Sequence, residues 1–207
     1  MIEDWLDRWK IGRTGWHEPT GNRNLQEHWS LSGRRVLVPL CGKTHDLLWL
    51  EEQGNEVVGV ELSDIAVRAF FEENELACEP VTGSLPGYRA VDRSITLYCG
   101  DYFEFRDDPF DAHYDRGALI ALTADLRARY ARHTAALLDD AAAQFVITIE
   151  YDQAVCDGPP FSVGPEEILE HWPRLRRLAS VEDIENAPPK FLDRGLQSMH
   201  EVVWVSD

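Results

Sequence analysis

Positive charge and long apolar runs are both scarce in this sequence. It holds 20 Lys and Arg against 37 Asp and Glu, which gives a formal net charge of −17. A surface of that sign repels phosphate backbones and anionic headgroups, so we expect no nucleic-acid partner and no binding to a membrane surface. No apolar run approaches the roughly 18 residues that a membrane-spanning helix needs. The beginning, Met1-Ile2-Glu3-Asp4-Trp5, lacks the basic and apolar segments of a secretory signal.

Cysteine is equally sparse, with 4 residues in the chain. No two of them have the spacing of metal ligands and none forms a Cys-x-x-Cys motif, so we predict no metal site. Three lie in or beside apolar runs, as reduced and mostly buried thiols do. The pattern favours a cytoplasmic protein. The four are Cys41, Cys78, Cys99 and Cys156.

Two periodicities alternate between residue 34 and about residue 172. Short apolar runs follow segments of helical periodicity, and this alternation is typical of a parallel sheet covered by helices on both faces. We predict strands at 35–40, 57–62, 95–99, 110–114, 144–150, 175–180 and 199–205. We predict helices at 44–53, after Ser63, at 119–138 and at 165–172, with a loop at 81–93.

The last two predicted strands lack a strong helical connection, so they should pair antiparallel at one edge. Hydrophobic residues make up 44% of the chain, enough for a sizeable core. The prediction is therefore an α/β fold in one domain over residues 1–207. It has a doubly wound, mostly parallel, seven-stranded sheet at 34–206 and an N-terminal helical lid at 1–30.

Candidate binding residues follow the first two strands, at the sheet edge where such folds bind ligands. Gly42 lets the backbone approach a ligand closely. The run Gly42-Lys43-Thr44 is not a phosphate-binding P-loop, because Leu37 stands where that motif needs glycine. Glu61 lies nineteen residues beyond Gly42, a spacing at which a carboxylate accepts hydrogen bonds from both hydroxyls of a ribose.

Two further candidates follow the third and fourth strands. Gly100-Asp101 lies where an adenine edge can be recognised, with an ordinary turn aspartate as the alternative. Arg116 can pair with a ligand carboxylate through two parallel hydrogen bonds. The alternative is a structural ion pair with Asp115 or Asp111.

Tryptophan is concentrated in the N-terminal segment. Trp5 and Trp9 are four residues apart and share one helix face, which serves either as core or as a lid. Trp16-His17 follow a pair of glycines and extend the same segment.

Several short motifs, in this order and spacing, resemble the thiopurine S-methyltransferase family, and the bacterial members most. The motifs are Trp5…Trp9, Gly15-Trp16-His17, Val38-Pro39-Leu40-Cys41-Gly42-Lys43, Val58-Gly59-Val60-Glu61-Leu62-Ser63, Asp115-Arg116-Gly117-Ala118-Leu119 and Gly158-Pro159-Pro160-Phe161. The resemblance covers nearly the whole chain. It implies the Rossmann-like class I methyltransferase fold and S-adenosylmethionine as the methyl donor.

The resemblance also implies roles for individual residues. The donor would be bound by Trp5, Trp9, Trp16, Leu40, Gly42, Glu61, Leu62, Gly100, Asp101 and Arg116. The acceptor would be bound by His17, Pro160, Phe161, Lys190 and Arg194. Arg116 and Asp115 are the candidate catalytic residues, and Arg116 would face either the methionine carboxylate or the acceptor.

The implied reaction is an in-line methyl transfer to a small thiol or thiopurine sulfur, or to selenium or tellurium. An ionised thiolate needs little help from a general base, and Arg116 would favour that anion. The alternatives are a methyltransferase for thiocyanate, halide or other small thiols, a nucleic-acid methyltransferase, and a donor-binding module without activity. We expect a monomer.

Overall fold

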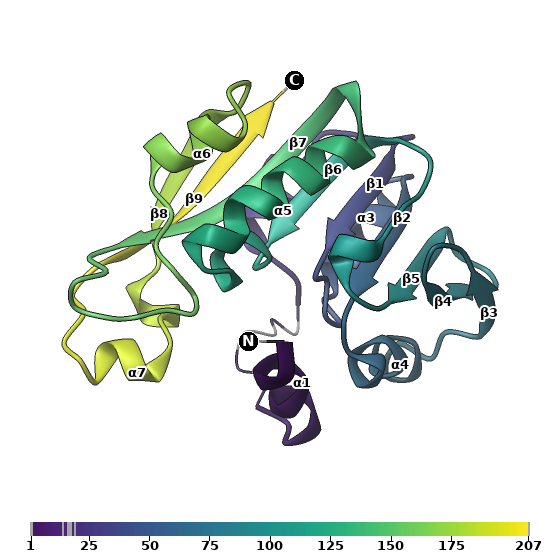
Figure 1. The fold of residues 1–207 in the computed structure, drawn as a ribbon, viewed down its shortest axis with the longest axis horizontal. Helices are drawn as coiled ribbons and strands as arrows, with labels where there is room; N and C mark the ends of the chain where they lie inside the picture. Colours follow the sequence, from purple (N-terminus) through teal and green to yellow (C-terminus); the bar gives the residue numbers. More distant parts are fainter. Residues whose placement is uncertain (1, 14, 16–17, 19, 207) are drawn as a thin grey trace. The chain divides into compact units, whose positions relative to one another are not determined.

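In the computed structural model, residues 2–13, 15, 18 and 20–206 are described. The chain forms two compact units, Met1–Ala112 and His113–Asp207, and the division falls inside strand β6 (Phe110–Arg116) (Figure 1). No helix among the described residues has both the length and the apolar character that crossing a membrane requires.

The first unit is built on three parallel strands, β1 (Arg35–Pro39), β2 (Glu56–Glu61) and β5 (Ile95–Cys99), with β2 in the middle. Valine and leucine dominate β1 and β2, and both strands are buried over nearly their whole length, as expected for strands covered on two faces. The pairing of Glu61 with Cys99 places the carboxyl ends of β2 and β5 side by side. All three strands were predicted.

A hairpin replaces the loop predicted at 81–93, and that prediction was wrong. Strands β3 (Cys78–Thr82) and β4 (Pro86–Ala90) pair antiparallel, and β4 continues the sheet beside β5. Proline begins β4, where no ladder hydrogen bond is lost. Gly87 faces the main chain of β5 so closely that a side chain would collide with the Leu97 carbonyl. The residues that indicated a loop therefore permit this pairing.

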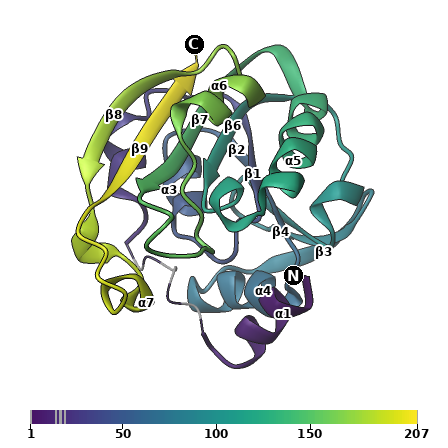
Figure 2. The same cartoon turned by 60° about the vertical axis from the view of Figure 1, so that its left-hand side comes forward.

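Four α-helices and one 3-10 helix accompany these strands in the described part of the first unit. Helix α3 (Asp46–Glu52) buries Leu47 and Leu50, and α4 (Asp64–Glu73) buries Val67 and Phe70. Ser63 caps α4, since its hydroxyl accepts a hydrogen bond from the Ala66 N–H. Helix α1 (Ile2–Lys10) lies beside α4, and α2 (Arg23–His28) and the 3-10 helix η1 (Tyr102–Glu104) complete the unit (Figure 2).

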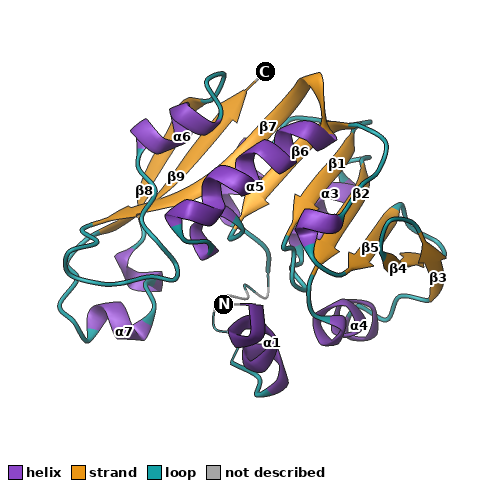
Figure 3. Ribbon diagram, in the orientation of Figure 1, coloured by secondary structure: helices purple, strands orange, loops and turns teal. Residues whose placement is uncertain are grey.

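The second unit contains a long antiparallel ribbon (Figure 3). Strand β9 (Met199–Ser206) lies between β7 (Leu138–Tyr151) and β8 (Arg176–Glu182) and pairs antiparallel with both. The antiparallel ending that the sequence indicated is thus confirmed. With β3 and β4, the described part of the chain has nine strands, where seven were predicted.

One long helix was predicted at 119–138, and the structure breaks it. A 3-10 helix, η2 (Leu119–Ala121), is followed by α5 (Ala124–Leu137), and β7 begins directly at Leu138. The break falls at Leu122 and Thr123, both of which have extended backbone conformations. Helix α5 packs against β7 and against α6 (Pro165–His171). The connection from β8 to β9 carries η3 (Ile184–Asn186) and α7 (Pro189–Leu192).

Candidate active site

The loop after β1 has the backbone conformation of a ligand cradle. Gly42 has a φ of +56°, which favours glycine, and Leu40 has a φ of +47°, which is uncommon for a branched side chain. Such strained positions are frequent at ligand sites. Lys43 does not point to a phosphate: its ammonium lies 2.5 Å from Glu73 Oε1 and fastens the loop to α4.

Glu61 is held by main-chain groups at the end of β2. The Gly42 N–H donates to Oε2 at 2.9 Å and the Ser63 N–H donates to Oε1 at 2.8 Å. Burial raises the pKa of Glu61, and these two hydrogen bonds lower it. Each oxygen keeps a further acceptor position, because a carboxylate accepts about four hydrogen bonds. Glu61 therefore has the chemistry to bind a pair of hydroxyls.

The loops after β1, β2 and β5 are joined to one another. The Cys41 N–H donates to the Val60 carbonyl, and the Gly100 N–H donates to the Glu61 carbonyl at 2.9 Å. Asp101 caps η1, since Oδ1 accepts from the Phe103 N–H at 2.9 Å. Leu62 lies between Glu61 and the Ser63 cap, and its carbonyl accepts from the Cys99 thiol. The residues predicted to bind the methyl donor at these three strand ends thus lie together.

Trp9 lies against the glycine loop. A methyl group placed on Gly42 would approach within 3.3 Å of Trp9 Cζ2, and the indole is buried. Trp5 is half-buried and carries the Arg8 guanidinium over its ring at 4.8 Å. Helix α1 therefore contacts the loop after β1 at Trp9. Trp16 and His17 lie outside the described residues.

Asp115 and Arg116 end β6. Asp115 is fully buried: Oδ1 accepts from the N–H groups of Ala118 and Leu119, and Oδ2 accepts from the Tyr130 hydroxyl at 2.7 Å. Burial raises the pKa of Asp115 to about 6. Arg116 is half-buried at the strand end. Sequence reasoning missed Tyr130, and the only sequence signal was that a buried tyrosine needs a partner for its hydroxyl.

The loop at 157–161 is held by side chains of the second unit. The Lys190 ammonium donates to the Pro159 carbonyl at 2.7 Å, and the Tyr151 hydroxyl donates to the Pro160 carbonyl at 2.8 Å. The Phe161 N–H donates to the Ile120 carbonyl. The structure thus brings three of the predicted acceptor residues together: Pro160, Phe161 and Lys190.

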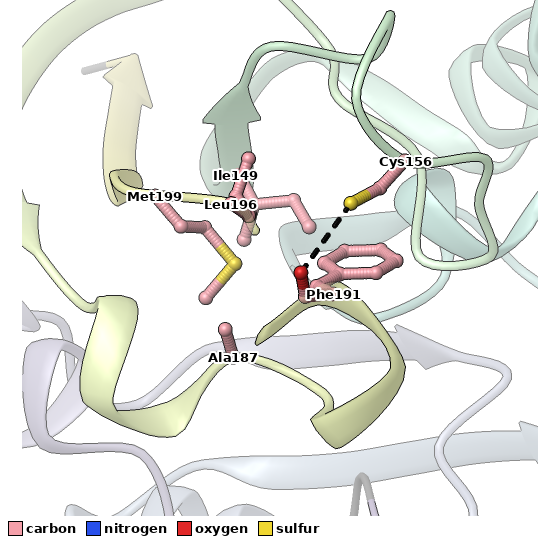
Figure 4. Close-up of a cluster of buried hydrophobic side chains, with 6 residues drawn as sticks. All are labelled: Ile149, Cys156, Ala187, Phe191, Leu196 and Met199. Atoms are coloured by element: carbon pink, nitrogen blue, oxygen red, sulfur yellow. Dashed lines mark hydrogen bonds between the residues drawn. The ribbon is translucent and has the colours of Figure 1, made fainter. Parts of the chain in front are cut away.

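A buried apolar cluster packs Phe191 of α7 against Ile149 of β7 and Cys156 (Figure 4). The thiol of Cys156 donates to the Phe191 carbonyl, drawn as a dashed line in the figure, and the Tyr151 ring packs on Phe191 with centroids 4.9 Å apart. Arg194, just beyond α7, is largely exposed and lies 3.9 Å from Asp157. The cluster consists of Ile149, Cys156, Ala187, Phe191, Leu196 and Met199.

Solved structures share this fold and define its class. A methyltransferase from Burkholderia thailandensis, 1,6-didemethyltoxoflavin-N1-methyltransferase, matches with a TM-score of 0.63 and 17% identity, covering 99% of this chain and 86% of its own. A TehB-like methyltransferase from Corynebacterium glutamicum matches with a TM-score of 0.55 and 15% identity, covering 100% and 98%. The fold is therefore the α/β Rossmann-like fold of the methyltransferases that use S-adenosylmethionine.

Sequence comparison identifies the family. The family model for thiopurine S-methyltransferase (TPMT) matches residues 1–207. A thiopurine S-methyltransferase of Bordetella petrii is 41% identical over 98% of this chain and 96% of its own. One of Pseudomonas syringae pv. syringae is 42% identical over 97% and 95%. The chain belongs to the thiopurine S-methyltransferase family, and it is an S-adenosylmethionine-dependent methyltransferase.

The strand ends of the first unit fit the donor chemically. Gly42 leaves room that a Cβ would take, and Glu61 offers acceptor positions for ribose hydroxyls. The donor, when bound, supplies a methyl group on a positively charged sulfur. An indole such as that of Trp9 attracts a cation to its face.

Proposed function

We propose that the acceptor is the sulfur of a small aromatic thiol of the thiopurine type, with selenium and tellurium species as further acceptors. The observation that carries the acceptor proposal is the match to the thiopurine S-methyltransferase family over residues 1–207. The buried Glu61 at the joined strand ends supports the binding of the methyl donor. In the reaction, a bond forms between the acceptor sulfur and the methyl carbon while the bond to the donor sulfur breaks. The negative charge of the thiolate cancels the positive charge of the sulfonium.

The residues then act mainly by positioning. Glu61 binds the ribose, and Trp9 excludes water above Gly42. Arg116 binds either the donor carboxylate or the acceptor anion, and both are worth about 1.5–3 kcal/mol as charged hydrogen bonds. Correct placement alone contributes several kcal/mol to such a displacement, up to about 7–11 in model systems. No general base is required for an acceptor that is already ionised.

Lys190 and Arg194 have different roles in this proposal. Lys190 holds the 157–161 loop through the carbonyls of Pro159 and Asp157, whereas Arg194 is largely exposed in an ion pair with Asp157, which an anionic acceptor would replace. We expect Arg194→Met to lower kcat/KM for anionic thiols about tenfold and to leave neutral acceptors unchanged. Lys190→Met should lower kcat/KM for both kinds equally. Equal losses with Arg194→Met would contradict the assignment.

We also propose that the protein is a cytoplasmic monomer. The cytoplasmic location is supported by the free cysteines and by the family. Light scattering of the purified chain tests the monomeric state. A dimer at micromolar concentration would contradict it.

A methylation screen tests the function. The purified chain and S-adenosylmethionine are incubated with aromatic thiols, thiocyanate, iodide and selenite, and methylated products are quantified by mass spectrometry. We expect aromatic thiols to give the highest kcat/KM and Glu61→Ala to abolish every product. Preference for thiocyanate or iodide would instead identify a small-anion methyltransferase. Donor binding without any product would point to a binding module.

A further inference from the structure

The turn that follows Arg116 is held by hydrogen bonds to a side chain of the second unit, Asp115. The chain leaves β6 at Arg116 and reaches η2 at Leu119 through Gly117, whose φ of +96° favours glycine. Asp115 Oδ1 accepts from the N–H groups of Ala118 and Leu119 at 3.1 and 3.2 Å. These are the orphan donors at the start of a helix, so the carboxylate closes the turn around Arg116.

Tyr130 holds the same carboxylate from the opposite side. Its hydroxyl donates to Asp115 Oδ2 at 2.7 Å, and both side chains are fully buried. The Tyr130 ring packs edge-on against Trp172, with centroids 6.3 Å apart. A hydrogen bond from a hydroxyl to a carboxylate is among the strong ones.

Helix α5, which carries Tyr130, is itself fixed. Arg127 lies one turn before Tyr130 and donates to the Leu122 carbonyl at 2.9 Å, just beyond η2. The same guanidinium forms two hydrogen bonds with Glu167 of α6. Tyr130 thus has a defined position relative to the turn at 116–119.

We propose that Asp115 and Tyr130 are positioning residues that orient the Arg116 guanidinium for methyl transfer. The proposal rests on the function proposed for Arg116. Both side chains are fully buried, so in this proposal they act through the turn and not on a ligand directly. A guanidinium displaced by about 1 Å loses about 100-fold in rate when it positions reacting groups.

The titratable neighbours of Asp115 link this arrangement to pH. The one in printed contact is Tyr130 on α5, while His113 and Arg116 are its titratable neighbours along β6 in sequence. Burial lowers the pKa of His113 to about 3, so this ring is neutral. Burial raises the pKa of Asp115 to about 6, and the Tyr130 hydroxyl lowers it. A proton on Oδ2 would oppose the bond that Tyr130 donates, so acid should loosen the turn.

A double-mutant cycle between Tyr130 and Arg116 tests the proposal. We expect Tyr130→Phe to lower kcat/KM about tenfold or more and to shift the acid limb of its pH profile to higher pH. In an Arg116→Met background, Tyr130→Phe should have no further effect, because residues that act through each other are not additive. The same loss in both backgrounds would overturn the proposal. An Arg116→Met variant with full activity would instead refute the function proposed for Arg116.

Two further variants separate positioning from folding. Asp115→Asn keeps an oxygen for Ala118 and Leu119 but is neutral, like the protonated acid, and presents an NH₂ group to the Tyr130 hydroxyl. It should therefore show a reduced kcat/KM at every pH and no acid limb. An acid limb that persists in Asp115→Asn would contradict the proposal, even if Tyr130→Phe fails to fold. Ser206→Ala is the matched control, since it removes a buried hydroxyl that accepts from the Gln144 N–H elsewhere in the unit. It should leave the pH profile unchanged.

Discussion

The hydrogen bonds that join the functional loops are donated mainly by main-chain N–H groups around Glu61 in the first unit, whereas side chains donate several of those that hold the 157–161 loop in the second unit. Around Glu61, the donors are the N–H groups of Gly42 and Ser63. Around the 157–161 loop, the donors are the side chains of Lys190 and Tyr151. Main-chain donors persist through most substitutions, but side-chain donors are lost by a single one. We therefore expect the loops of the first unit, where we propose that the methyl donor binds, to tolerate substitution better than the 157–161 loop, where we propose that the acceptor binds.

We expect the largest effect on donor affinity from substitution of Glu61, the side chain that we propose binds the ribose of the methyl donor. Glu61→Gln replaces one acceptor oxygen by an NH₂ group that faces a main-chain N–H, so one ribose contact is lost, at a cost of about 1.5–3 kcal/mol. We expect the affinity for S-adenosylhomocysteine to fall about 100-fold in calorimetry. Glu73→Gln, at the exposed partner of Lys43, is the control. Unchanged affinity in Glu61→Gln would place the ribose elsewhere.

We expect a smaller effect, on stability, where close packing leaves no room for a side chain on a glycine. Gly59 lies in the middle of β2, and a Cβ there would come within 2.5 Å of Leu97 Cδ2 and 2.7 Å of Cys41 Sγ. Gly59→Ala should lower the free energy of unfolding near the upper end of about 1–3 kcal/mol, as measured by urea denaturation. Gly164→Ala in the second unit has open space around it and should cost less than about 1 kcal/mol. If Gly59→Ala and Gly164→Ala lowered the free energy of unfolding equally, the close packing around Gly59 would not limit stability.

The same contrast explains how far the sequence predicted the molecule. Apolar strand runs are local patterns, so the seven strands were predicted correctly. The spacing of Gly42 and Glu61 is also local, and the binding role that it indicated stays a prediction. The β3–β4 hairpin was missed because its proline and glycine also signal loops. The partners of Asp115 and Pro159 were missed because Tyr130 and Lys190 lie 15 and 31 residues away. Only packing in three dimensions brings such pairs together.

The pH dependence of stability should separate two buried groups of the second unit. The folded chain keeps His113 neutral, with a pKa of about 3 against 6.5, so its contribution is lost as pH falls from 6.5 toward 3. Asp115, with a pKa of about 6 against 3.8, has the opposite sign: its contribution is lost as pH rises from 3.8 to 6. Where the two ranges overlap, His113 and Asp115 change the free energy of unfolding with opposite signs as pH changes. Each contributes at most about 1.4 kcal/mol per pH unit.

Asp115→Asn removes one of the two slopes. The free energy of unfolding of this variant should therefore fall more steeply between pH 6 and pH 4 than that of the wild type. Urea denaturation at several pH values measures it, with Asp125→Asn as an exposed control on α5. A slope identical to wild type would show that Asp115 does not titrate in this range.

The smallest effect concerns the charge of the whole chain, which acts on both units. A net charge of −17 repels an anionic acceptor over distances longer than a hydrogen bond, while Arg116 and Arg194 attract it only nearby. Salt screens the long-range term first, because the Debye length falls from about 10 Å at 0.1 M to about 3 Å at 1 M. We therefore expect kcat/KM for an anionic thiolate to rise a few-fold with ionic strength, and kcat/KM for a neutral acceptor to stay constant. If kcat/KM for the anionic acceptor falls with salt, the attraction of Arg116 and Arg194 outweighs the repulsion of the acidic surface. The surroundings of these two arginines would then differ in electrostatic potential from the rest of the chain.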